Sequence, residues 1–298
     1  MNKGVVWTGV AIPLLVFAIG TLVAQDNKET PANVGSQACL ACHESAAALF
    51  KRNSEAWGAS AHSKALGLVV NNSQSSPDCY SCHSDEGFKA KAQGKKVDLV
   101  QKASFNPVTC VTCHKVPHEA QNNHQLVMDP ETLCSSCHTQ RSALQGKGAR
   151  GIEETRSFHS AVDCISCHMT DGTHSMKVFR PDDPEVSENR VDTCTACHKD
   201  NNRKARITQL QEWQASYKLD MDRLQAEVNT ISAALKENPA LLDDNMKSKL
   251  NDVRFNLSIL VRDRSRGAHN VDFTGEILSV ASKSLKEIEG HRGQTDAK

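Results

Sequence analysis

This chain of 298 residues has few aromatic side chains, no net charge and no cysteine outside one repeated motif. Aromatic residues make up 4% of the sequence and hydrophobic residues 39%, which predicts a thin apolar core for a globular chain of this length. The 35 basic residues balance the 35 acidic ones, and a net charge of zero argues against nucleic acid as a partner. After residue 24, no apolar segment is long enough to span a membrane. No cysteine lies outside one repeated pentapeptide.

The repeated pentapeptide is Cys-x-x-Cys-His, and it occurs six times. Its first cysteines are Cys39, Cys79, Cys110, Cys134, Cys164 and Cys194. Its second cysteines are Cys42, Cys82, Cys113, Cys137, Cys167 and Cys197, and its histidines are His43, His83, His114, His138, His168 and His198. Two thiols at this spacing can add to the two vinyl groups of one porphyrin, while the histidine places an imidazole under the iron. The pattern predicts six covalently bound haem c groups.

Zinc binding and a redox disulfide are the alternative interpretations of paired cysteines. Zinc sites use such pairs two at a time and give no reason for a histidine directly after each pair. Histidine accounts for 13 of 298 residues, so six chance histidines have a probability of (13/298)⁶, roughly 10⁻⁸. A disulfide framework fails on the same count. An export leader also argues against a cytosolic zinc protein.

The leader is residues 1–24, which have the pattern of a signal peptide. Lys3 provides the positive charge, and an uncharged, mostly apolar stretch runs from there to the small residue Ala24. An uncleaved membrane anchor is the alternative, although Pro13 and Gly20 weaken a spanning helix. Either way the bulk of the chain is exported, and thioether attachment of haem takes place outside the cytoplasm. We therefore expect a periplasmic protein, bound to the membrane only if the leader is retained.

The rest of the chain divides into a linker at residues 25–33, a hexahaem domain at 34–200 and a C-terminal helical domain at 201–298. Successive motifs are 40, 31, 24, 30 and 30 residues apart, so the haem domain is not a solenoid of fixed period. Residues 39–198 provide 160 positions for six haems, or about 27 for each. The predicted fold is mainly α with much irregular loop, wrapped around a haem stack.

The C-terminal region shows the three-four apolar spacing of amphipathic helices. The first stripe is Leu210, Tyr217, Met221, Leu224, Val228, Ile231 and Leu235. After Asn238 and Pro239 a second stripe contains Leu242, Met246, Leu250, Val253, Leu257 and Leu260, and a third contains Phe273, Ile277, Val280, Ser284 and Ile288. With Gly267 ending the second helix, these stripes predict a helical hairpin plus a docking helix. Some of these apolar residues could instead form a homodimer seam.

Each haem iron also needs a second axial ligand, and neutral imidazole is the usual partner in low-potential multihaem chains. Seven histidines lie outside the motifs: His62, His118, His124, His159, His174, His269 and His291. His291 lies in a polar tail and is the expected spare. Met128, Met169 and Met176 are alternative ligands.

The order of features resembles a known superfamily. His168-Met169, His174, the sixth motif, a long charged helix and residues 266–270 resemble the C-terminal half of the pentahaem ammonia-forming nitrite reductases. Residues 34–39 and 60–66 resemble the tetrahaem cytochrome that accepts electrons from hydroxylamine oxidoreductase. Together these resemblances cover roughly residues 34–285, and they are specific to the superfamily rather than to one activity.

The resemblance implies the distal ligands. They are His62 for the haem of His168, His159 for that of His198, His174 for that of His114, and His269 for that of His138. His118 and His124 then remain for the haems of His43 and His83. The nitrite reductases carry Lys in place of one motif histidine, and the matching position here is His83. Residues 141–158 contain no histidine to match their catalytic one.

These departures argue against nitrite reduction, although the haem of His83 is the one expected to have an open or exchangeable distal face. The first hypothesis is an electron carrier between a quinol-oxidising membrane complex and a terminal reductase or other cytochromes. It assigns no catalytic residue. The alternative is an oxidoreductase of nitrogen or sulfur oxyanions, such as nitrite, hydroxylamine or tetrathionate, at one five-coordinate haem. A third is a subunit of a polymeric cytochrome wire or an outer-membrane conduit.

Overall fold

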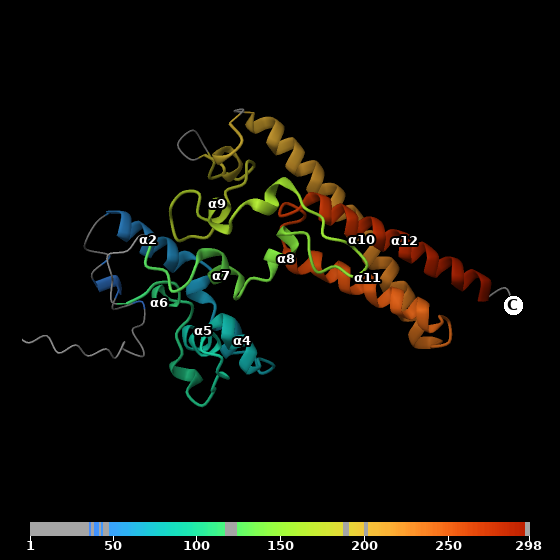
Figure 1. Cartoon of the computed structure of the whole chain (residues 1–298), viewed down its shortest axis with the longest axis horizontal. Helices are drawn as coiled ribbons and strands as arrows, with labels where there is room; N and C mark the ends of the chain where they lie inside the picture. Colours follow the sequence, from blue (N-terminus) through green and yellow to red (C-terminus); the bar gives the residue numbers. More distant parts are fainter. Residues whose placement is uncertain are drawn as a thin grey trace, which may run out of the picture. The chain divides into compact units, whose positions relative to one another are not determined.

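The computed structural model describes residues 36, 39–41, 43, 48–116, 124–186, 191–199 and 202–295. Residues Val34–Lys298 form one compact unit, and every contact described below lies within it. The described residues form helices and loops and no β strand, with one isolated antiparallel bridge between His114 and Leu126 (Figure 1). The mainly α fold with much irregular loop is thus confirmed.

Each described motif from the second onward begins or lies on a short helical turn. These turns are α4 (Pro77–His83), α6 (Cys110–Cys113), α7 (Pro130–Ser135), α9 (Cys164–His168) and η4 (Thr193–Ala196). Short polar side chains cap them: Asp129, Asp163 and Asp192 each accept a backbone N–H three residues later. The turn brings the motif histidine back over the first cysteine, so that the N–H of His114 donates to the carbonyl of Cys110 at 2.9 Å.

Further short helices connect the motifs. They are α2 (Ala48–Ala59), η1 (His62–Lys64), α3 (Gly67–Val70), α5 (Asp85–Ala92), η2 (Lys102–Ser104), α8 (Gln140–Leu144) and η3 (Phe158–Ala161). The indole of Trp57 donates to the carbonyl of Val108 at 3.0 Å, which holds α2 against the residues just before the third motif. Such contacts set the relative positions of segments that have little apolar core of their own.

Three long helices form the C-terminal region: α10 (Arg203–Glu237), α11 (Asp244–Asp263) and α12 (Val271–Thr295). Asn202 and Asp243 cap the first two by accepting the N–H groups of Ala205 and Met246. The predicted break is confirmed, because α10 ends just before Asn238. Within the described residues, no helix is long and apolar enough to cross a membrane.

Three details of the helical prediction were wrong. The second helix ends at Asp263 rather than at Gly267, because Arg264 adopts a left-handed φ of 59° that ends α-helical geometry. Leu242 lies before α11 rather than on it. In the third helix, Leu285 rather than Ser284 occupies the fully buried position.

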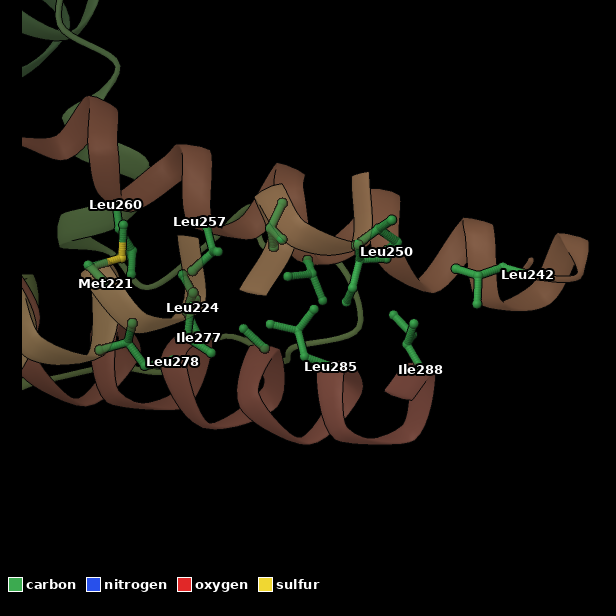
Figure 2. Packing of buried hydrophobic residues seen from close by; sticks show 14 of the residues in the cluster. Met221, Leu224, Leu242, Leu250, Leu257, Leu260, Ile277, Leu278, Leu285 and Ile288 are labelled. Atoms are coloured by element: carbon green, nitrogen blue, oxygen red, sulfur yellow. The ribbon is translucent and has the colours of Figure 1, made fainter. Parts of the chain in front are cut away.

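The apolar stripes of the three helices meet in one core. Figure 2 shows side chains from α10, α11 and α12 pointing toward one another. Its members include Met221, Leu224, Val228 and Ile231 of α10, Leu250, Val253, Leu257 and Leu260 of α11, and Phe273, Ile277, Leu285 and Ile288 of α12. Leu250 is completely buried, with an exposed fraction of 0%. The C-terminal region therefore has an apolar core built from its own three helices.

Two asparagines hold the loop between α8 and η3 against these helices. The amide of Asn256 accepts the N–H of Arg150 at 2.7 Å and donates to its carbonyl at 2.9 Å. The amide of Asn270 donates to the carbonyl of Thr155 at 2.8 Å. Gly146 permits this approach, since its φ is 69° and a Cβ there would lie 1.8 Å from the Thr155 oxygen. The segment just before the fifth motif is thereby fixed to α11 and α12.

Replacing Leu250 by Ala is expected to destabilise the protein by about 2–5 kcal/mol, because it leaves a cavity in the fully buried helical core. Chemical denaturation followed by circular dichroism measures this change. Leu219→Ala on α10 is the matched control, since Leu219 is 72% exposed and should change stability by less than about 0.5 kcal/mol. Equal effects of the two substitutions would contradict the described packing.

Candidate haem-binding sites

Three motif histidines have the ring orientation that an iron ligand requires. The Nδ1 atoms of His83 and His168 lie 3.1 Å from the carbonyl oxygens of Ala65 and Met176, and Nδ1 of His114 lies 2.8 Å from that of His124. A carbonyl oxygen only accepts hydrogen bonds, so Nδ1 must carry the proton. In the neutral form of each ring, Nε2 is then the nitrogen without a proton and is the atom that could coordinate a metal.

Two of the residues that supply these carbonyls have a strained backbone. His124 has a φ of 56° and Met176 a φ of 54°, in the left-handed region that costs a non-glycine residue about 1 kcal/mol. This conformation turns each carbonyl toward a motif histidine. Met176 is one of the alternative axial ligands that the sequence offers, and in the structure its backbone carbonyl contacts Nδ1 of His168.

Four motif histidines each face one histidine from outside the motifs. The ring centroids are 6.0 Å apart for His62 and His138, 5.9 Å for His114 and His174, 6.5 Å for His159 and His198, and 6.4 Å for His168 and His269. A metal–imidazole bond is about 2.0–2.1 Å long, and the ring centre lies roughly 1.1 Å beyond the nitrogen. Two imidazoles on opposite sides of one iron would thus have centroids about 6.3 Å apart. The observed pairs fit this requirement.

Burial keeps several of these rings in the neutral form that binds iron. Burial lowers the pKa of His62, and the neighbouring His138 lowers it further. Burial likewise lowers the pKa of His174, with His114 as the second cause. Nδ1 of His174 is itself buried and has no hydrogen-bond partner in the described structure.

Two of the four histidine pairs implied by the resemblance lie face to face in the structure, and the other two are arranged differently. His159 does face His198 and His174 does face His114, as expected. His62 and His269 are exchanged: His62 faces His138, and His269 faces His168.

The exchange has a physical cause in the docked loop. Asn270 bonds Thr155 and also lies 3.5 Å from the hydroxyl of Ser160, and both residues shortly precede the fifth motif. The neighbouring His269 is therefore held beside His168 rather than beside His138.

The remaining predicted site residues are less completely described. Cys42 and His118 lie outside the described residues, so their roles stay predictions. The ring of His43 packs edge-on against Phe50, with centroids 4.8 Å apart. His124 contributes its carbonyl to His114, and nothing here tests a ligand role for its ring. His291, the expected spare, lies on α12 with Nε2 3.6 Å from Asp243.

The motif cysteines are close to one another, and none of those described forms a disulfide. Burial raises the pKa of Cys113 to about 12, and the thiols of Cys134 and Cys137 are the next causes. Burial raises the pKa of Cys137 to about 11, followed by the neighbouring thiol of Cys82. Burial therefore favours the uncharged thiols, and a thioether formed from them would be uncharged as well.

These thiol neighbours also define which motifs lie side by side. The second motif contacts the fourth through Cys82 and Cys137, and the fourth contacts the fifth through Cys134 and Cys164. The fifth contacts the sixth, because Cys197 and Cys167 interact.

Comparison with known proteins agrees with this geometry. Residues 38–115 match the family model described as cytochrome c554 and c-prime, and residues 103–143 match the doubled CXXCH motif. The chain is a multihaem c-type cytochrome. Covalent haem attachment through its CxxCH motifs is the binding mode that these family models describe. No curated protein matches the cytochrome.

Two solved structures share the fold of this cytochrome. The structure of the outer cell wall cytochrome OcwA has a TM-score of 0.64 and 24% sequence identity, covering 77% of this chain and 49% of that one. The undecahaem cytochrome from the S-layer of Carboxydothermus ferrireducens has a TM-score of 0.60 and 24% identity, covering 85% and 45%. The chain therefore spans about half the length of either protein, and at this identity the likeness concerns the fold.

Replacing His174 by Ala is expected to convert one ferric haem from low-spin to high-spin, because His174 is the ring that faces His114. Electron paramagnetic resonance of the oxidised cytochrome measures this as one new high-spin signal. His291→Ala is the control and should leave the spectrum unchanged, since His291 lies beside Asp243 on the long helices. A new high-spin signal in the control alone would contradict the assignment.

Proposed function

We propose that this chain is an exported hexahaem cytochrome that conducts electrons through haems with two histidine ligands. The observation that carries the proposal is the set of four facing histidine pairs, each at the separation that one intervening iron requires. The haem supplies the one-electron chemistry, and the protein supplies the attachment, the orientation and the potential.

The residues of each such site suit a carrier. Two cysteines would attach the porphyrin edge and a histidine from each side would hold the iron, so that these four sites would offer no position to a substrate. The distal ligands are His174, His62, His269 and His159 for the third to the sixth motif. Their pairing with motif histidines far away in the sequence also fixes the loops between motifs.

The contacts between motifs support a continuous path for electrons. The second, fourth, fifth and sixth motifs follow one another through the thiol neighbours Cys82–Cys137, Cys134–Cys164 and Cys167–Cys197. The third motif joins at the fourth, since Cys113 lies near both of its cysteines. Porphyrins attached at such neighbouring thiols would lie close to one another, and the haems would supply one-electron chemistry.

Export and redox partners complete the proposal. Thioether attachment occurs outside the cytoplasm, and the two similar structures come from a cell-wall and an S-layer cytochrome. We place the chain in the periplasm or on the cell surface, with residues 1–24 as a cleaved leader or an anchor. It would receive electrons from a quinol-oxidising membrane complex and pass them to a terminal reductase or another cytochrome, as a monomer or as a homodimer through the C-terminal helices.

The denatured protein is expected to exceed its polypeptide mass by six haems, because all twelve cysteines belong to complete motifs. Intact-mass spectrometry of the purified protein measures this directly. Replacing both Cys194 and Cys197 by Ala should remove one haem and leave five. A wild-type mass equal to the bare polypeptide, or to the polypeptide plus zinc, would contradict the proposal.

Reduction of a small oxyanion at the haem of His83 is the second candidate function. Among the described residues, no histidine ring outside the motifs faces His83, although its Nδ1 is bonded to Ala65 in the manner of an axial ligand. This observation favours a distal position that an external ligand could occupy.

We expect the wild-type oxidised protein to show one high-spin ferric signal that nitrite, cyanide or hydroxylamine perturbs if this second function exists. His83→Ala should abolish that perturbation, whereas His138→Ala, which affects a haem with a facing histidine, should not. A wild-type spectrum that is entirely low-spin and insensitive to these ligands leaves electron transfer as the function.

A further inference from the structure

The turn between α11 and α12 contains a carboxylate aimed at a haem ligand. Asp263 is the last residue of α11, and its side chain is only 4% exposed. Its Oδ1 lies 2.6 Å from Nδ1 of His269, the ring that faces His168. Its Oδ2 accepts the hydroxyl of Ser265, and that hydroxyl oxygen accepts the backbone N–H of His269 at 3.1 Å. Hydrogen bonds within this turn therefore fix the positions of both carboxylate oxygens.

The backbone of this turn is strained in order to close it. Arg264 and Arg266 have φ values of 59° and 54°, each costing a non-glycine residue about 1 kcal/mol, and Gly267 has a φ of 90°. These conformations bring His269 back toward the end of α11. Local strain of this kind persists when surrounding contacts hold it, and here Asn270 anchors the far side of the turn to Leu144 and Thr155.

The other hydrogen bonds described for Nδ1 atoms of histidine rings have uncharged acceptors and are weaker than the one to Asp263. The acceptor is a neutral backbone carbonyl for His83, His114 and His168, and also for His159, whose Nδ1 lies 3.3 Å from the carbonyl of Ala268. Nδ1 of the distal His174 has no partner in the described structure. In the four facing pairs, as far as the described residues show, His269 is the ring whose Nδ1 contacts a carboxylate.

We propose that Asp263 is a positioning residue that, through His269, gives the haem of His168 the lowest reduction potential among the four facing-histidine sites. A carboxylate that accepts the Nδ1 proton draws it away from the ring, so that Nε2 becomes a stronger electron donor to iron. Stronger donation stabilises the ferric over the ferrous state. This inference rests on the proposed function, because it assumes that a haem is held between His168 and His269.

The position of this site gives the low potential a role in the path. The fifth motif contacts the fourth through Cys134 and Cys164, and the sixth through Cys167 and Cys197. An electron moving between the fourth and the sixth motif would pass through the site of the fifth motif, which has the lowest reduction potential under this proposal. The carboxylate at the end of α11 thereby controls how readily the sixth motif exchanges electrons with the rest of the chain, without any proton transfer.

The test is potentiometric titration of the full holoprotein carrying Asp263→Asn, which keeps the shape and a hydrogen-bond acceptor and removes the charge. In this variant, one of the one-electron steps should shift to a more positive potential. In the wild type, that same step should have the most negative potential among the four sites with facing histidines. His269→Met marks the same step independently, since a thioether ligand raises the potential of its own haem. Electron paramagnetic resonance should show a changed low-spin signal for that haem in Asp263→Asn.

Asp252→Asn is the matched control, because Asp252 lies on the same helix, has the same charge and pairs with the exposed Arg150. It should leave every step in place. Asp263→Asn with unchanged potentials would overturn the proposal, and so would a shift of equal size in the control. Conversion of one haem to high-spin in Asp263→Asn would also overturn it, since Asp263 would then only hold the ring in place. The haem count and low-spin spectrum of the wild type test the proposed function separately.

Discussion

The proposed function of the haem region depends on one geometric requirement, that two imidazoles from distant parts of the chain lie on opposite sides of the same iron. His168 and His269 are far apart in the sequence, as are His62 and His138, yet their ring centroids are 6.4 Å and 6.0 Å apart, the separation that an intervening iron would require. Each pair that held an iron would be a long-range cross-link, because a ligand bound only by the folded state adds its binding free energy to folding. That contribution would supplement the thin apolar core of a chain with 4% aromatic residues.

The three C-terminal helices have an apolar core of their own, with Leu250 and Ile277 fully buried. The side chains of Asn256 and Asn270 hold the loop before the fifth motif against these helices through hydrogen bonds to its backbone. His269 lies in the turn between α11 and α12, and the hydrogen bonds of the neighbouring Asn270 hold that turn in place beside His168.

The sequence was informative where chemistry is local and less so where it depends on docking. The Cys-x-x-Cys-His pattern, the three apolar stripes and the break at Asn238 depend on neighbours along the chain, and the structure agrees with the helices they predict. The exchange of His62 and His269 arises from Asn270 binding Thr155, a contact without any periodic signal. The carbonyl of Met176 was equally hidden, because the left-handed backbone that aims it is not encoded by a glycine.

Sites with the same pair of ligands need not have the same potential. All four facing pairs consist of two imidazoles, but the acceptor at Nδ1 differs: a carboxylate for His269, a carbonyl for His159, and no partner within the described residues for the buried Nδ1 of His174. Since a ligand's own hydrogen bond affects its donor strength, these differences would give the proposed haems different potentials. One turn, residues 263–270, supplies both the carboxylate for His269 and the Ala268 carbonyl for His159. This one turn thus provides the hydrogen-bond acceptors for the facing histidines of both the fifth and the sixth motif. Its strained backbone is consistent with a conformation that surrounding contacts hold in place.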